Sequence, residues 1–364
     1  MQHPVDVSAL PEAARKVLNG PQPIKVMAAR GMAPLPPVAM VCALYGLAWS
    51  TEPALRDAAT SSLASLPEAV LNVALSSPEL PAAVLDDLAE RVVARRAFLE
   101  RVVQHPNAAG ETVARVARGA DEALAEMIAR NEQRLLTSPE VIEALYMNPL
   151  TRMSTSDRIV EFAARNGLKV AIPGFEHIVA ALMHQPIPEP SDEPLPSDLS
   201  FSEALAEAEA FGLDDVEEDD DGEVHLGERA AKAEKKLEDM SVSEKIRTAM
   251  LGTGGQRALL IRSRNRLVAA AVLDSPKLAD DEVIKYAGSR VVSEDILRRI
   301  ANRGSWLRLY EVKLNLVQNP KTPVADAMKL VVLLRESDVK RIATSKNVPA
   351  AVRTLANNHQ KKRK

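Results

Sequence analysis

Arginine and lysine side chains in the last third of the chain are the residues whose type and spacing point most directly to chemistry. They gather at two expected helix junctions and at the carboxyl end: Arg262, Arg264 and Arg266; Arg298, Arg299, Arg303 and Arg308; and Lys361, Lys362, Arg363 and Lys364. Such cations can hold nucleic acid or an acidic partner, with an affinity that falls steeply with salt. Alternatively, these residues have no ligand and simply form the charged, solvent-exposed face of a helical protein.

Other groups that could do chemistry fit structural roles better. The glycines of 252–257 lack the Gly-Lys-Ser/Thr ending of a phosphate loop. His177 and His184 are two helical turns apart, but no further His or Cys lies nearby to complete a metal site. The acidic run 214–221 lacks the alternating ligands and central glycine of a calcium loop. We therefore expect no catalytic residue, no cofactor and no metal.

Carboxylates are abundant, but none lies in an apolar run where burial would raise its pKa. The single cysteine, Cys42, stands inside the apolar run 38–44 and is expected to be a small core residue. One cysteine also excludes an internal disulfide framework, which fits a reducing compartment.

Composition favours helices. The chain has 364 residues, of which 46% are apolar and only 3% aromatic, and Ala, Leu and Val dominate its apolar content. Such residues suit helix–helix packing better than a sheet. The amino terminus lacks a signal-peptide pattern, and no segment approaches the roughly 20 apolar residues that span a bilayer. We expect an all-α, cytoplasmic protein without a membrane span.

Charge divides the chain into three parts. Residues 1–185 carry a net charge of −3, residues 186–242 a net charge of −15, and residues 243–364 a net charge of +14. The middle part is rich in proline and acid and is expected to be a disordered, flexible linker, because it has little apolar surface to bury. The first part is then an amino-terminal helical lobe and the last a basic carboxyl-terminal helical lobe. The acidic linker is a possible intramolecular partner of the basic lobe.

A recurring phrase links the two lobes. Leu75–Pro81, Leu273–Leu278 and Val317–Pro323 each end an apolar helical pattern with a polar residue and a proline, after which another helical pattern begins. Proline cannot continue a helix interior but suits a first turn. Recurrence in both halves predicts two short α-solenoids built from degenerate helical repeats.

The phrase resembles leucine-rich-repeat-variant and HEAT-like α-solenoids. The whole chain outside the linker also resembles an uncharacterised family of two-lobed helical proteins of myxobacteria and related delta-proteobacteria. The segments that carry this resemblance are 131–136, 146–158, 165–167, 265–273 and 319–323. It implies a fold, and no particular activity or site.

The favoured function is a non-catalytic scaffold or regulator that binds an unknown protein partner in a groove of stacked helices, with access tuned by the acidic linker. The alternative is a nucleic-acid-binding protein that uses the basic lobe. A third possibility is an enzyme with an unfamiliar site.

Overall fold

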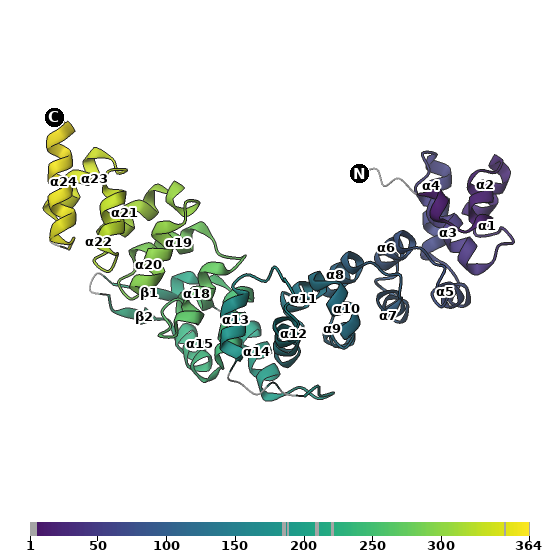
Figure 1. Cartoon of the computed structure of the whole chain (residues 1–364), viewed down its shortest axis with the longest axis horizontal. Helices are drawn as coiled ribbons and strands as arrows, with labels where there is room; N and C mark the ends of the chain where they lie inside the picture. The colour runs from purple at the N-terminus through teal and green to yellow at the C-terminus, as the bar shows by residue number, and fades with distance from the viewer. Residues whose placement is uncertain are drawn as a thin grey trace. The chain divides into compact units, whose positions relative to one another are not determined.

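The computed structural model describes residues 6–183, 187, 189–207, 211–219, 222–345 and 347–363, and it is mostly helical, as expected. Contacts divide the chain into two compact units (Figure 1). The first comprises Met1–Thr151 and Asn166–Val170, and the second comprises Arg152–Arg165 and Ala171–Lys364. Residues 152–165 and 171–183, assigned to the first lobe by the charge pattern, thus lie in the second unit.

The first unit is built from short helices, several of which begin at a proline. Pro37, Pro53 and Pro139 occupy first-turn positions, where the missing N–H is not needed. In chain order the helices are η1 (Val7–Ala9), α1 (Glu12–Leu18), α2 (Gln22–Ala29), α3 (Pro37–Ala48), α4 (Pro53–Ala64), α5 (Glu68–Ala74), α6 (Ala82–Arg91), α7 (Arg96–Gln104), α8 (Gly110–Arg118), α9 (Glu122–Ala129), α10 (Glu132–Thr137) and α11 (Pro139–Tyr146).

Most helices of the first unit pack on helices two or three places away as well as on a neighbour. The helix α3 contacts α1, α4, α5 and α6, and the stack continues through α8, which lies against α6 and α11. The buried face of α8 consists of small and branched side chains, Thr112, Val113, Ala114 and Ala117, which allow close approach. Alternate helices thus form a continuous apolar core.

The second unit contains the remaining helices and one short antiparallel hairpin, β1–β2, in which Val216 pairs with Leu226. Its elements are α12 (Met153–Arg165), α13 (Phe175–Leu182), α14 (Pro196–Glu207), η3 (Leu213–Asp215), β1 (Val216–Glu218), β2 (Val224–Leu226), α15 (Glu228–Asp239), α16 (Val242–Leu251), α17 (Gly254–Leu260), α18 (Arg266–Asp274), α19 (Asp280–Gly288), α20 (Glu294–Asn302), η4 (Trp306–Arg308), α21 (Tyr310–Gln318), α22 (Val324–Val331), α23 (Glu336–Thr344) and α24 (Ala350–Arg363).

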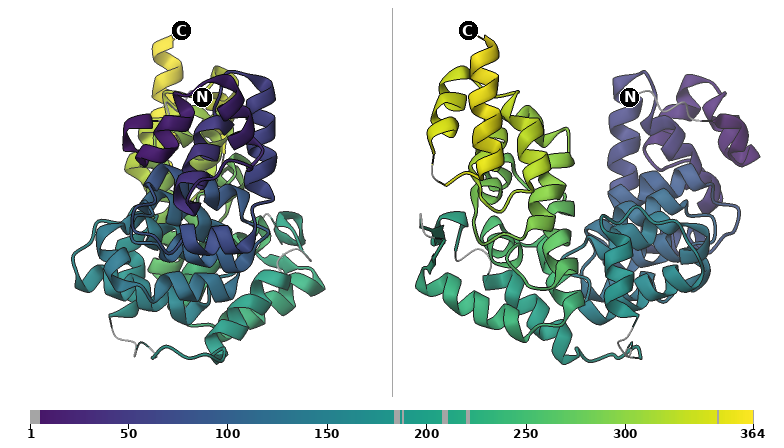
Figure 2. Two further views of the ribbon diagram at one scale, coloured as in Figure 1. Left: turned by 90° about the vertical axis from the view of Figure 1, so that its right-hand side faces the viewer. Right: turned by 60° about the vertical axis from the view of Figure 1, so that its left-hand side comes forward.

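Helix pairs also stack within the second unit. Contacts join α16 to α18, α19 to α21, and α22 to α24, while α12, α13 and α14 pack around the start of the stack near α16. The last helices lie side by side in Figures 1 and 2. Most of these helices expose one polar face and bury Leu, Ile, Val and Ala on the other.

The expectation of a disordered linker over 186–242 is wrong for its described residues. Helices α14 and α15 and the β1–β2 hairpin fall within this range, and α14 and α15 contact each other. Apolar side chains account for the order, because Phe201, Phe211 and Leu237 are each at most 5% exposed. Burial of these few side chains offsets the loss of conformational entropy on ordering the segment. Its acidic residues alone would not provide that stabilisation.

A polar residue before a proline, Asn319 in the recurring phrase and Asn148 at the similar step Asn148-Pro149, ties one turn to an earlier one. The Asn148 amide donates to the Ala117 and Ala120 carbonyl oxygens at 2.8 and 2.7 Å, and Asn319 does the same to Ala287 and Ser289 at 3.0 and 2.7 Å. Each Asn also accepts the backbone N–H two residues later. The phrase is therefore a structural joint whose side chain satisfies carbonyl groups at the end of an earlier helix.

Among the described residues, every helix falls short of the length and apolarity required to cross a lipid bilayer.

Candidate functional site

An acidic segment from Phe211 to Asp219 lies over α17 and the end of α19 in the second unit. The element η3 contacts α17, as does β1, and β2 contacts α15 (Figure 2). A cavity of about 540 Å³ separates the segment from α17, α19 and α21. Its lining is mostly polar on the helix side, with Arg262, Lys285, Tyr286 and Asn315 among its residues. We call this space, together with the helix surface that the segment covers, including Gly255, the hairpin groove.

Glu218 makes the most directional contact in the groove. Its Oε1 accepts a hydrogen bond from the Arg290 backbone N–H, and its Oε2 accepts one from the Ser289 hydroxyl, both at 2.5 Å. Ser289 is the C-cap of α19, so the chain has just left the helix and its next N–H is free to donate outward. One carboxylate therefore occupies a two-donor site, in which charge-assisted bonds are strong.

Phe211 anchors the other end of the segment. It is 5% exposed, and a Cβ atom placed on Gly255 would lie 2.7 Å from the ring. The same Cβ would lie 2.8 Å from the Gly212 carbonyl oxygen. The absence of a side chain at Gly255 thus lets the aromatic ring and the backbone rest directly on α17.

Two further cations face the segment. Lys285 pairs with Asp214 at 2.7 Å and lowers the pKa of that carboxyl group, although the Asp214 side chain remains almost fully exposed. Arg262 donates from Nε to the Ala258 carbonyl oxygen at 2.8 Å, while its buried Nη2 meets no hydrogen-bond partner among the described residues. Burial lowers the pKa of the Arg262 guanidinium. The groove therefore holds one donor that the hairpin leaves unmet.

The other predicted arginines are mostly committed to contacts inside the second unit. Arg266 pairs with Asp295 at 2.8 Å, and Arg298 pairs with Glu294 at 2.7 Å. Arg299 reaches Asp274 at 2.8 Å and the Ala270 carbonyl oxygen at 3.2 Å, which lies 29 residues earlier.

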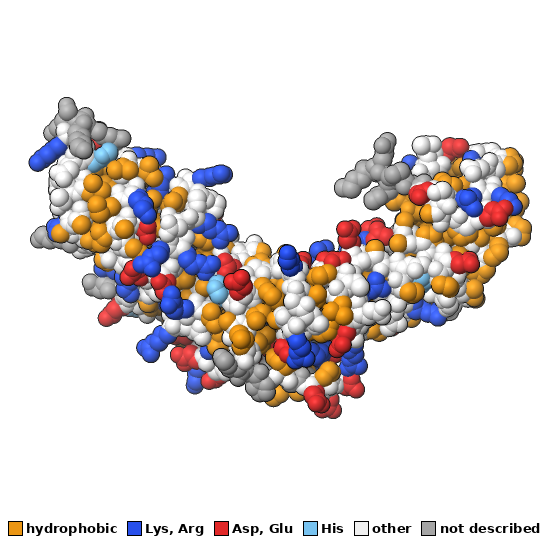
Figure 3. Space-filling model, in the orientation of Figure 1, with side chains coloured by type: hydrophobic (Ala, Val, Ile, Leu, Met, Phe, Trp, Pro, Cys, Tyr) orange, Lys and Arg blue, Asp and Glu red, His pale blue; other side chains and the backbone are white. Residues whose placement is uncertain are grey.

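Arg303 completes this pattern. It donates to the Leu273 carbonyl oxygen at 3.0 Å and covers the Trp306 ring at 4.2 Å. Arg264, Arg308 and Lys361 are exposed. The side chains of Lys362, Arg363 and Lys364 lie outside the described residues. The described side chains of this set are thus distributed over several separate contacts, and Figure 3 shows acidic and basic side chains interspersed on the visible face of this unit.

Arg257, close in sequence to the predicted cluster, is buried instead of available. Its guanidinium contacts both oxygens of Glu282 at 3.0 and 2.9 Å, and the two residues are 4% and 1% exposed. It also donates to the Gly252 carbonyl oxygen at 2.8 Å. The glycine-containing stretch therefore serves as a turn that a buried ion pair fastens to α19.

A polar cluster joins α12, α14 and α16. Asp198 accepts the Ser154 N–H at 2.8 Å and its hydroxyl at 3.0 Å, and Asp157 accepts the Ser243 hydroxyl. Arg247 is fully buried, with its guanidinium 4.5 Å from the Phe201 ring centre.

The expectation that no carboxylate is perturbed by burial is wrong at Asp157. The residue keeps partial exposure, but burial of its carboxyl group raises its pKa to about 7. The hydrogen bond from Ser243 and the charge of Arg247 oppose that shift, and nearby Glu244 and Asp198 add to it. The local sequence is polar, so the burial became apparent only from the packing of α12 against distant helices.

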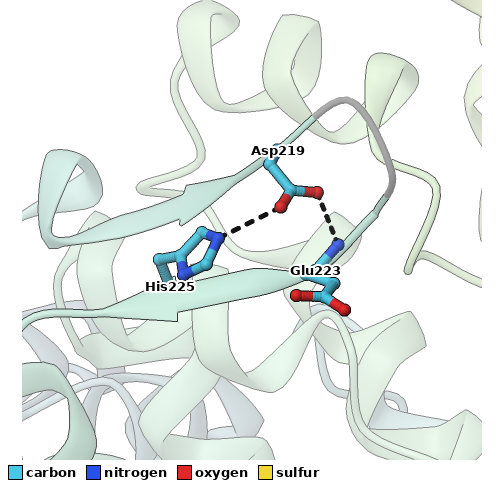
Figure 4. Close-up of side chains that lie close together, drawn as sticks. All are labelled: Asp219, Glu223 and His225. Carbon is cyan, nitrogen blue, oxygen red and sulfur yellow. Dashed lines mark hydrogen bonds and ion pairs between the residues drawn. The ribbon is translucent and has the colours of Figure 1, made fainter.

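The histidines do not assemble a site with one another. His177 lies 3.6 Å from Asp274, and His184 lies outside the described residues. In the hairpin, His225 and Glu223 both contact Asp219, as Figure 4 shows. Both Asp219 oxygens are thus engaged within this exposed trio, which fastens the two strands together.

Sequence reasoning predicted the acidic segment and a contact with the basic carboxyl-terminal lobe, but not the residues that make this contact. The available signal was the apolar set Phe211, Leu213 and Val216 inside an otherwise acidic run. No protein-family model matches this chain, and neither a curated protein nor a solved structure matches it.

Proposed function

We propose that the chain is a non-catalytic protein-binding scaffold or regulator whose two units are short α-solenoids. The carbonyl contacts of Asn148 and Asn319, made at comparable sequence offsets in both units, support a shared repeat. The likeness to HEAT-like and leucine-rich-repeat-variant proteins remains part of this proposal.

One observation carries the functional part. The hairpin groove already holds an acidic segment by an aromatic anchor, an ion pair and a bound carboxylate, which are contacts that a protein scaffold can also offer to a partner's peptide. The same segment then regulates access, because a partner must displace it. The alternative, nucleic-acid binding, draws less support, since Arg299 and Arg303 donate to carbonyl oxygens of the unit and acidic side chains lie among the basic ones on its visible face.

Affinity capture with the full-length chain, followed by mass spectrometry, tests the proposal. We expect protein partners that survive nuclease treatment. A mobility-shift titration with duplex and single-stranded nucleic acid at several salt concentrations tests the alternative. The full chain is required, because α16 packs on α13 and α14, which a fragment from residue 243 would lack. Partners lost on nuclease treatment, together with a salt-dependent shift, would favour the alternative.

A further inference from the structure

We infer that residues 211–218 occupy, within the chain, the site of a partner's acidic segment. The partner's segment would bind the hairpin groove through the same contacts, so we call residues 211–218 the stand-in. The inference rests on the proposed function and names its ligand: an acidic peptide that makes one 3-10 turn before a short strand, with an aromatic residue, a central apolar residue, and a glutamate seven positions after the aromatic one.

The spacing follows from the contacts of the segment. Phe211 rests on the bare backbone at Gly255, and Glu218 fills the two-donor site of Ser289 and Arg290. Between them, Val216 is half-buried while Glu217 is exposed, as the alternation of a strand requires. The groove would thus contact the first, sixth and eighth residues of a ligand, which correspond to Phe211, Val216 and Glu218. The seventh residue, which corresponds to Glu217, would face solvent.

Charge complementarity identifies the occupant as acidic. Arg262 and Lys285 line the groove, and the Ser289 hydroxyl and the Arg290 N–H point to the same carboxylate. The stand-in leaves Arg262 Nη2 without a partner beside a cavity of about 540 Å³. A partner segment with one more acceptor would satisfy this donor and bind better than the chain's own segment.

The stand-in is suited to displacement. Its ion pair with Lys285 is solvent-exposed, and exposed pairs contribute little to stability. A two-stranded hairpin is also only marginally stable by itself. Its advantage is covalent attachment, which gives an effective concentration on the order of millimolar.

A labelled peptide with the sequence of residues 211–219 tests the inference by fluorescence anisotropy on the full-length protein. The variant with Phe211→Ala and Glu218→Gln should bind the peptide at least about tenfold more tightly than the unmodified protein, because the internal competitor is weakened. Glu217→Gln is the matched control and should leave binding unchanged. Because loss of Phe211 can also disturb folding, Glu218→Gln alone, checked by thermal unfolding, should give a smaller gain in the same direction.

Changes in the peptide test which positions are read. Replacing its Phe211 or Glu218 equivalent should weaken binding about tenfold, whereas replacing its Glu217 equivalent should not. No gain in either protein variant, or equal losses from the Glu217 and Glu218 changes, would overturn the inference. Displacement of the peptide by an oligonucleotide at physiological salt would overturn it in favour of nucleic acid. Captured partners that the peptide does not displace would leave the proposed function standing and refute only this ligand.

Discussion

The Glu218 carboxylate accepts the backbone N–H of Arg290 at 2.5 Å, although the two residues are 72 positions apart in sequence. The contact attaches the acidic segment to the second unit, because the Arg290 N–H just after α19 is a donor in a fixed position for the Glu218 carboxylate. Its strength can be measured without any partner protein.

Glu218→Ala should speed hydrogen exchange at the Arg290 amide. A hydrogen bond to a charged group contributes about 1.5 kcal/mol or more, so the expected acceleration is roughly tenfold or greater. Glu217→Ala, whose side chain points outward, is the control and should leave this amide unchanged. Equal exchange in both variants would show that the contact does not persist in solution.

Gly255→Ala should expel Phe211 from its seat. The added Cβ has no room, since the ring and the Gly212 carbonyl oxygen would lie within 2.8 Å of it. Proteolysis between residues 211 and 219 should become faster while the helical content stays unchanged by circular dichroism. Gly304→Ala, where a Cβ meets nothing within 4 Å, is the control. Unchanged cleavage in the Gly255 variant would contradict the packing.

Arg257→Ala should destabilise the second unit by about 3–5 kcal/mol, because it leaves the Glu282 carboxylate buried without its cation. Arg298→Ala removes an exposed pair with Glu294 and should cost about 0.5 kcal/mol or less. Urea unfolding monitored by circular dichroism distinguishes the two. Similar losses in both variants would mean that the Arg257 pair is not buried in solution.

Asp157 should make stability fall as pH rises from about 4 to about 7. In this window the unfolded carboxyl is ionised while the folded one, with a pKa of about 7, still holds its proton. The expected loss is on the order of 2–4 kcal/mol, at about 1.4 kcal/mol per pKa unit, and it levels off above pH 7.

Asp157→Asn should flatten this part of the pH profile in denaturant unfolding. The amide cannot ionise, so the proton-linked loss of stability disappears. Glu176→Gln, at an exposed position, should keep the slope of the unmodified protein. A slope that persists in the Asn variant would assign the pH dependence to another group.

Asn319→Ala should destabilise the chain by about 1–3 kcal/mol, because two carbonyl oxygens, of Ala287 and Ser289, lose their donor. Asn302→Ala removes an exposed amide bonded within its own helix and should change stability by about 0.5 kcal/mol or less. Thermal unfolding compares the pair. If the two variants unfold alike, the joint carries no net stability.

Local sequence predicted much of the helical fold and little of the site. Proline at the start of α3, α4 and α11 and the polar residue of the recurring phrase act within a few residues, so their roles follow from pattern alone. The packing of Phe211 on Gly255 and the burial of Arg247 near Met153 both involve residues more than forty positions apart in sequence, so local pattern could not predict them. The average composition of residues 186–242 is acidic, so it predicted disorder. It did not reveal that Phe201, Phe211 and Leu237 are buried and hold the segment in place.

The two joint asparagines also resist chemical ageing. Asparagine commonly converts to aspartate when the following backbone nitrogen attacks the side-chain amide. Asn148 and Asn319 are each followed by proline, whose nitrogen carries no hydrogen, so this route is closed. Conversion would place a negative charge against carbonyl oxygens that now receive a donor. Pro149 and Pro320 therefore also protect the side-chain amides of Asn148 and Asn319, which bind the carbonyl oxygens at the end of an earlier helix.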